Sequence, residues 1–235
     1  MSCLLFNVKK HVASLAAAVL LGACASGPRP PDWQIEAKGS MERSVAAYLQ
    51  GHPRIASAEL AGARSQLSRT GRADLLATAE LLHCAARVAS LVFEPCAGFV
   101  ILRLDATQAQ RTYADYLHGQ IVPVENVPLL PEAQRAPAQG DADALKRIAD
   151  PLAQLLAAGV LLQTGRASPA VITQAIDTAS SQGWRRPLLA WLGVQAQRAE
   201  QGGDVQAAAH LRRRMAIAQE SAPAVQRQDF EKEKP

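Results

Sequence analysis

The sequence predicts an all-α fold of about eight or nine helices, arranged as stacked hairpins. Alanine is abundant and aromatic residues make up only 4% of the chain, a composition that favours closely packed helices over sheets. Between Trp33 and Gln219, nearly every segment repeats its apolar residues with helical spacing between helix start and stop signals. The tetrapeptide Thr-Gly-Arg-Ala occurs at 70–73 and again at 164–167, each time between two helical segments, which indicates helical hairpins.

An N-terminal helical half is expected over residues 37–118. Its helices are expected at residues 41–50, 53–69, 75–92 and 106–117. The third helix, which Asp74 can cap, is apolar almost all round and is therefore expected at the centre of the fold. Between it and the fourth helix, residues 99–104 (FVILRL) fit either a strand or a buried helical turn, and the helical neighbours favour the turn. Asp105 and Gln108 resemble a capping box for the fourth helix.

Residues 119–140 are expected to form a long connection, followed by a C-terminal helical half over 141–219. The connection contains four prolines: Pro123, Pro128, Pro131 and Pro137. Connections of this length are often functional or disordered. The second half is expected to hold helices at 141–163, with a kink or a new start at Pro151, and at 168–180, 187–200 and 204–219. The polar and charged residues 220–235 are expected to be a disordered tail.

The first 23 residues are expected to be a secretory signal peptide. The basic residues Lys9, Lys10 and His11 precede a short apolar run at 12–20, too short to span a bilayer. The next four residues, Leu21-Gly22-Ala23-Cys24, resemble the lipobox of bacterial lipoproteins. The resemblance implies a diacylglycerol on the Cys24 thiol, cleavage before this residue and acylation of the new amino group, which together anchor a protein stably in a membrane. An ordinary signal peptide with a chance cysteine is the alternative.

Residues 24–36 are expected to be the lipidated tether, because the stretch ASGPRPPD at 25–32 is rich in proline. The residue after the cysteine is Ala25 and not aspartate. In lipoproteins of this kind an aspartate there favours retention in the inner membrane. The resemblance therefore implies the outer membrane, facing the periplasm, with the inner membrane as the alternative.

Charge and cysteine content bear on the expected partners and on the expected crosslinks of the chain. The signal peptide carries two of the lysines behind the formal net charge of +4, so the mature chain is near neutral and nucleic acid is not an expected partner. Two cysteines remain besides Cys24, namely Cys84 and Cys96. In an oxidising compartment this pair predicts a structural disulfide. Two buried free thiols are the alternative.

Parts of the chain resemble tetratricopeptide repeats. The second helix of that repeat has glycine, alanine, a large apolar residue and alanine at fixed offsets, which matches Gly51, Ala56, Leu60 and Ala63. A second, partial match comprises Trp191, Gly202, Ala207 and Leu211. The chain departs from the repeat at three positions: Ala47, Ser68 and Arg214. The resemblance implies an α-solenoid of stacked hairpins, and a non-repeating helical bundle is the alternative.

Catalytic motifs are not apparent in the sequence. It has no H-E-x-x-H metal motif, no G-x-S-x-G nucleophile elbow and no phosphate-binding loop, so an enzyme, a metal and a cofactor are not expected. Arg212 and Arg213 lie in the densest basic cluster. They could contact acidic lipids or an acidic partner, or form a solvated helix face. Trp184 and Trp191 are candidate partner contacts, or core residues.

The function expected from this plan is that of a protein-interaction or scaffold module in the cell envelope. This rests on architectural analogy with outer-membrane lipoproteins that the chain resembles. One alternative is a carrier of a lipid or small molecule, with an apolar cavity lined by Phe99, Ile101, Trp184 and Trp191. A less favoured alternative is an enzyme that acts on the cell wall.

Overall fold

The structure, a computed structural model, describes residues 29–220. Within that range all regular secondary structure is helical, with nine α-helices of seven residues or more, one single-turn helix and two 3-10 helices. The expected all-α class is therefore confirmed. The expected signal peptide at residues 1–23, Cys24 and residues 221–235 lie outside the described residues.

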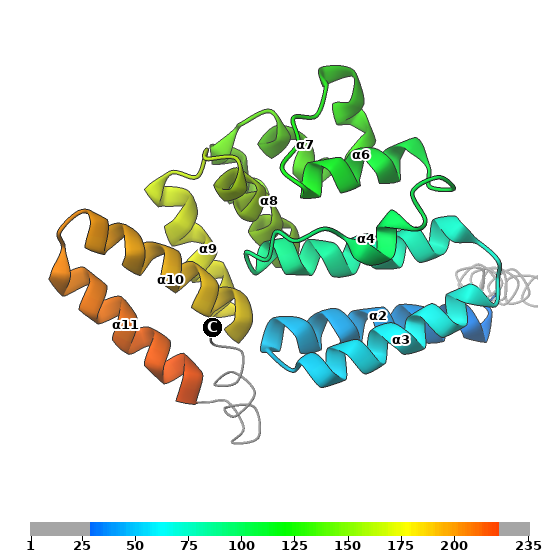
Figure 1. Cartoon of the computed structure of the whole chain (residues 1–235), viewed down its shortest axis with the longest axis horizontal. Helices are drawn as coiled ribbons and strands as arrows, with labels where there is room; N and C mark the ends of the chain where they lie inside the picture. The colour runs from blue at the N-terminus through cyan, green and yellow to red at the C-terminus, as the bar shows by residue number, and fades with distance from the viewer. Residues whose placement is uncertain (1–28, 221–235) are drawn as a thin grey trace, which may run out of the picture.

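The elements follow one another along the chain with short connections. They are α2 (Asp32–Gln50), α3 (Pro53–Ser68), α4 (Ala73–Ala89), α5 (Ala97–Val100), α6 (Gln108–Leu117), η1 (Val124–Leu129), α7 (Glu132–Ala138), η2 (Ala142–Arg147), α8 (Pro151–Gln163), α9 (Pro169–Ser181), α10 (Arg185–Gln201) and α11 (Val205–Glu220). Figure 1 shows α2 and α3 as a hairpin beneath α4, and α6 and α7 above α4. Helices α9, α10 and α11 lie at the left of this view.

Helix α4 lies at the centre of the molecule, as its apolar sequence predicts. It packs against α2 and α3 on one side, and against α5, α6 and α8 on the others. Its residues enter all four hydrophobic clusters of the described chain, through Leu81, Ala89, Ala79 and Ala86 respectively. A helix with no polar face is stable only when several neighbours cover it, and α4 has these neighbours.

Contacts between helices far apart in the sequence make the fold an irregular bundle. In a solenoid each repeat contacts only its neighbours, whereas here α4 packs on α8 and α2 meets α10. At the second junction the Arg186 Nε donates to the Tyr48 carbonyl oxygen at 3.1 Å, and its guanidinium lies 4.4 Å from the centroid of the Tyr48 ring. Arg185 donates to the Gly51 carbonyl oxygen at 3.1 Å. Cations are favourable at the carboxyl end of a helix, so these arginines join α10 to α2.

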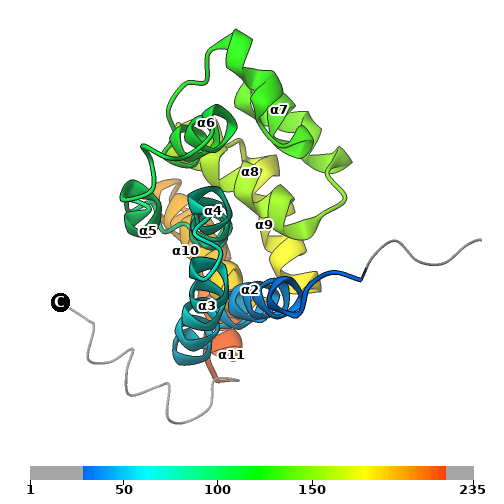
Figure 2. The same cartoon turned by 90° about the vertical axis from the view of Figure 1, so that its right-hand side faces the viewer.

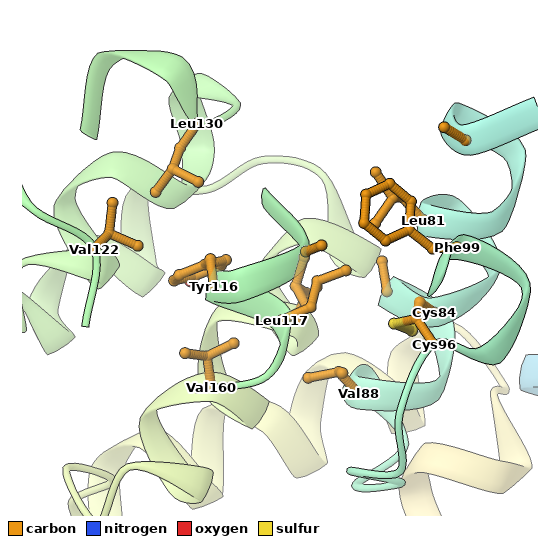
Figure 3. Packing of buried hydrophobic residues seen from close by; sticks show 14 of the residues in the cluster. Leu81, Cys84, Val88, Cys96, Phe99, Tyr116, Leu117, Val122, Leu130 and Val160 are labelled. Carbon is orange, nitrogen blue, oxygen red and sulfur yellow. A yellow bond between two sulfur atoms is a disulfide. The ribbon is translucent and has the colours of Figure 1, made fainter. Parts of the chain in front are cut away.

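A disulfide joins Cys84 of α4 to Cys96 just before α5, with 5.8 Å between their Cα atoms. The bond lies inside the largely buried cluster of Figure 3, beside Leu81 and Phe99. It holds the single turn of α5 against α4, so that Phe99 is only 2% exposed. The predicted disulfide is therefore present.

Loss of this disulfide is expected to destabilise the fold. Replacing both Cys84 and Cys96 by alanine should lower the free energy of unfolding by about 2–4 kcal/mol, since the crosslink restricts the unfolded chain. Denaturant unfolding with and without reductant measures the effect. The reduced natural chain should match the double variant, and a midpoint that is insensitive to reductant would contradict the expectation.

Several expected boundaries were wrong, for identifiable reasons. The first helix begins at Asp32 and not at Met41, so residues 32–36 of the expected tether are helical. Pro31 precedes this helix and Asp32 lies in its first turn, which suits the positive end of the helix dipole. Trp33 then packs against the cluster formed by α2, α3 and α4. The sequence did not indicate this turn, because its apolar residues are few and the prolines just before it are typical of a loop.

The segment between α5 and α6 also differs from expectation. Of the residues expected to form a buried turn, Ile101 is 82% exposed and Leu104 is 96% exposed. The capping box is formed by Thr107 and Gln110, two residues later than expected. Thr107 has the extended backbone of a cap and accepts from the Gln110 N–H at 3.2 Å, whereas Asp105 lies in the preceding turn.

Candidate functional site

The proline-rich connection folds against the core and forms one wall of an open groove of about 720 Å³. This volume is twice that of a second hollow, between α2 and α4, which measures about 360 Å³. We call the larger one the connection groove. It is lined by His118, Gly119, Ile121, Val122, Val124, Ala138, Gln139, Gln163, Thr164 and Arg166.

The first wall follows the end of α6. Gly119 has φ +72°, a left-handed conformation that glycine adopts without strain, and the turn is closed by the Gln120 N–H donating to the Asp115 carbonyl oxygen at 3.0 Å. Beyond the turn, Val122 is 8% exposed and belongs to the core. Its neighbour Ile121 is 93% exposed. One valine therefore fixes the segment while an adjacent isoleucine is presented to solvent.

The second wall is the end of α8. The Thr164 hydroxyl donates to the Val160 carbonyl oxygen at 2.8 Å and accepts from the Arg166 Nε at 3.0 Å. Arg166 thus extends from an ordered turn, the second copy of the Thr-Gly-Arg-Ala sequence. Gly119 lies close to Gln163, because a Cβ at that glycine would be only 2.9 Å from the Gln163 Cδ. The two walls meet there.

The chemistry of the groove is apolar and cationic. The exposed apolar side chains are Ile121 and Val124, the latter 75% exposed. None of the ten lining residues carries a carboxylate, whereas the Arg166 guanidinium has four N–H donors besides the Nε–H that is bound to Thr164. The Gln163 Oε1 is buried and has no hydrogen-bond partner in the described chain, so it is closed off from the groove. The groove therefore suits a ligand that combines an aliphatic group with a carboxylate.

Within residues 29–220, no group of three or more His, Cys, Asp or Glu side chains is arranged to hold a metal ion. In the same range, no helix has both the length and the apolar character needed to cross a membrane.

The four residues that the sequence indicated as possible partner contacts differ in their exposure in the structure. Trp191 is fully buried and its Nε1 donates to the Ala89 carbonyl oxygen at 3.1 Å, so its interpretation as a partner contact was wrong and the core alternative is confirmed. Trp184 is half-buried at the start of α10. Arg212 is exposed and forms an ion pair with Glu200. Arg213 is exposed on the same helix. None of the four lines the connection groove.

The residues expected to line a carrier cavity do not share one. Phe99 belongs to the cluster around α4 and α6, whereas Trp191 belongs to the cluster of α8, α9 and α10. Ile101 faces solvent. This set therefore does not form the expected cavity, because two different cores take up its buried members.

A histidine with a shifted pKa lies near the junction of α2, α4 and α10. His83 packs edge-on against the Tyr48 ring, with 5.6 Å between the centroids, and its Nδ1 is buried without a hydrogen-bond partner in the described chain. Burial lowers the pKa of His83, and the positive charge of Arg87 lowers it further. Glu80 acts in the opposite direction but does not reverse the shift. The neutral imidazole is therefore the form that the fold favours.

This shift predicts how stability changes with pH. The unfolded chain binds a proton at His83 more readily than the folded chain, so folding loses stability as the pH falls below about 6.5. Replacing His83 by phenylalanine should reduce the difference in melting temperature between pH 7.5 and pH 5.5. The same pH dependence in both proteins, measured by circular dichroism, would exclude a contribution from His83.

The sequence singled out the connection by its length and its prolines, and Thr164 and Arg166 by the repeated Thr-Gly-Arg-Ala turn, but it marked no residue of the groove as a partner contact. Which side chains of an irregular segment face outward depends on the turn at Gly119 and on the end of α8, neither of which has a periodic signal. Comparison of the chain with protein-family models, with curated proteins and with solved structures found no match.

Proposed function

We propose that the chain is a membrane-anchored lipoprotein of the cell envelope, and that its connection groove binds a segment of an envelope protein. The observation that carries this proposal is an open groove that exposes aliphatic side chains beside an arginine and contains no carboxylate. Small-molecule sites usually enclose most of their ligand. An open groove instead suits a chain segment that enters and leaves it.

The expected occupant combines two features. An aliphatic side chain would cover Ile121 and Val124, which otherwise remain in water, and burial of such surface is favourable by about 25 cal/mol per Å². A carboxylate, from Asp, Glu or a chain terminus, would accept hydrogen bonds from the Arg166 guanidinium.

The proposed location follows from the lipobox. Acylation at Cys24 would hold the domain on a membrane that faces the periplasm, and Ala25 favours the outer over the inner membrane. The mature chain is near neutral, so a protein segment is a better-suited partner than nucleic acid. A scaffold or adaptor acts by such contacts alone, and needs no cofactor.

Site-specific photocrosslinking in cells tests this proposal. A benzophenone amino acid at Ile121, and separately at Val124, should trap the same envelope protein. The trapped peptide, mapped by mass spectrometry, should contain a carboxylate within a few residues of the crosslink. The change Arg166→Glu should weaken capture at least tenfold, since it replaces attraction by repulsion.

The matched control places the same probe at Val205 of α11, which is 75% exposed like Val124 but does not line the groove. This probe should not trap that protein. Equal capture from all three positions, or capture that Arg166→Glu leaves unchanged, would exclude the groove as the binding site. Melting curves of each variant show whether it remains folded.

A further inference from the structure

Three segments lie at one end of the molecule, and we call this region the entry end. They are the start of α2 at Asp32, the turn at 69–72 and the segment 101–107. The Gln110 side chain at the start of α6 donates to the Asp74 carbonyl oxygen at 2.7 Å and to the Thr78 hydroxyl at 2.9 Å. Trp33 of α2 lines a hollow with Thr78 and other residues near the start of α4. The starts of α2, α4 and α6 are therefore neighbours.

The entry end exposes large aliphatic side chains in a short stretch of chain. Within five residues, Val100 is 57% exposed, Ile101 82% and Leu104 96%. On the first turns of α2, Ile35 is 47% exposed. Single exposed apolar residues are ordinary, but several close together mark a surface that contacts a partner or a membrane. The view in Figure 2 shows α2, α5 and α6 grouped around α4.

The exposed side chains are held in place rather than carried on a free loop. The disulfide at Cys96 precedes them, and the buried Phe99 and Ala106 anchor the segment on both sides. Arg103 is bound to Asp115 of α6 at 2.8 Å. The fold therefore holds Ile101 and Leu104 in exposed positions. In a mobile segment, these side chains could instead turn toward the core.

The position of the chain entry identifies the occupant of this surface. Helix α2 begins eight residues after Cys24, and eight extended residues span at most about 29 Å. A lipid on Cys24 would thus keep the entry end within a short reach of the bilayer. We propose that the entry end docks on the membrane surface, with Ile101 and Leu104 inserted at the boundary between headgroups and acyl chains. This inference rests on the lipid anchor of the proposed function.

The charges around the entry end favour apolar over electrostatic docking. Arg72 is paired with Asp74, and Lys38 with Glu42, so both signs are present. Anionic lipids should therefore have little effect, and a zwitterionic bilayer should be sufficient. Trp33, which is half-buried in the first turn of α2, has the amphipathic character that suits the interface.

Fluorescence quenching in vesicles tests the docking. The mature lipoprotein is placed in phosphatidylcholine vesicles with an environment-sensitive NBD label on Leu104→Cys. This would be the only free thiol, since Cys84 and Cys96 are bonded and Cys24 is acylated in the proposal. The label should shift to the blue and be quenched at least twofold by doxyl-labelled lipids. The same label on Val205→Cys, at the start of α11, should show neither effect, because Figure 1 shows α11 at the end of the molecule opposite the turn between α3 and α4.

Flotation of the vesicles separates this inference from the anchor itself. Protein that floats, with a label at position 104 that is as little quenched as the label at 205, would overturn the docking and leave the anchor intact. Failure to float would contradict the anchor. A blue shift that needs an added protein, and not lipid alone, would also overturn membrane docking and assign the surface to a protein partner. The change Ile101→Asp, made in the labelled Leu104→Cys chain, should abolish quenching and retain flotation.

Discussion

Replacing Trp191 by alanine is expected to lower the free energy of unfolding by about 3–5 kcal/mol. The indole is fully buried where α10 crosses the end of α4. Its removal would leave a cavity in the cluster of α8, α9 and α10 and would remove the hydrogen bond to the Ala89 carbonyl oxygen. Replacement by phenylalanine keeps much of the ring and should have a smaller effect, of about 1–3 kcal/mol.

Urea unfolding followed by circular dichroism measures these differences. The half-buried Trp184, seven residues earlier, provides the control, because its replacement by alanine removes less buried surface. We expect Trp184→Ala to have a clearly smaller effect than Trp191→Ala. Equal losses, or a loss below about 1 kcal/mol for Trp191→Ala, would show that Trp191 does not link α10 to the core as described.

Replacing Gly159 by alanine should destabilise the protein by about 1–3 kcal/mol, although alanine is the better helix former. Gly159 lies in α8 where this helix passes closest to α4. A Cβ there would be 2.5 Å from the Val88 carbonyl oxygen. That oxygen belongs to the backbone of the central helix, so it can move only if the two helices separate.

A second helical glycine provides the control for this prediction. At Gly193 of α10, a Cβ would meet only the end of the Met215 side chain, at 3.9 Å. Gly193→Ala should therefore stabilise the protein by up to about 1 kcal/mol through helix propensity alone. Thermal unfolding of both variants gives the comparison. A Gly159→Ala variant as stable as Gly193→Ala would contradict the close approach of α4 and α8.

Local sequence signals predicted most helices and the central place of α4. Glycine turns, caps and first-turn prolines mark real boundaries, as at Gly51 and at Asp150, whose side chain accepts from the Ala153 N–H. The helices of the proline-rich connection were harder to predict, because η1 and α7 are too short to show a helical repeat of apolar residues. Both helices also contain a proline, which gives the segment a composition typical of a loop.

Pairings between distant helices could not be predicted, because each depends on partners with no sequence relation. Glu80 lies in apolar α4 and is 6% exposed, which only its bidentate contact with Arg64 of α3 explains. Gly98 leaves room for that carboxylate, since a Cβ there would overlap it. None of the three residues is part of a recognisable motif.

The candidate site was predicted only in part, for the same reason. The length of the connection indicated where a function could lie, but the exposure of Ile121 and the burial of Val122 depend on the fold. Trp191 illustrates the converse case. A tryptophan is equally suited to a binding surface and to a core, and only the position of α10 against α4 decides between them.

The most direct test of the account is to follow acylation of the chain in cells. Cells that express the full chain are grown with an alkyne fatty acid, and the mass of the N-terminal peptide of the purified protein is measured. We predict a labelled protein that begins at an acylated Cys24, and an unlabelled, unprocessed precursor for Cys24→Ser. If the natural chain carries no label, or if Cys24→Ser is labelled and cut in the same way, the lipid anchor and the functions built on it are contradicted.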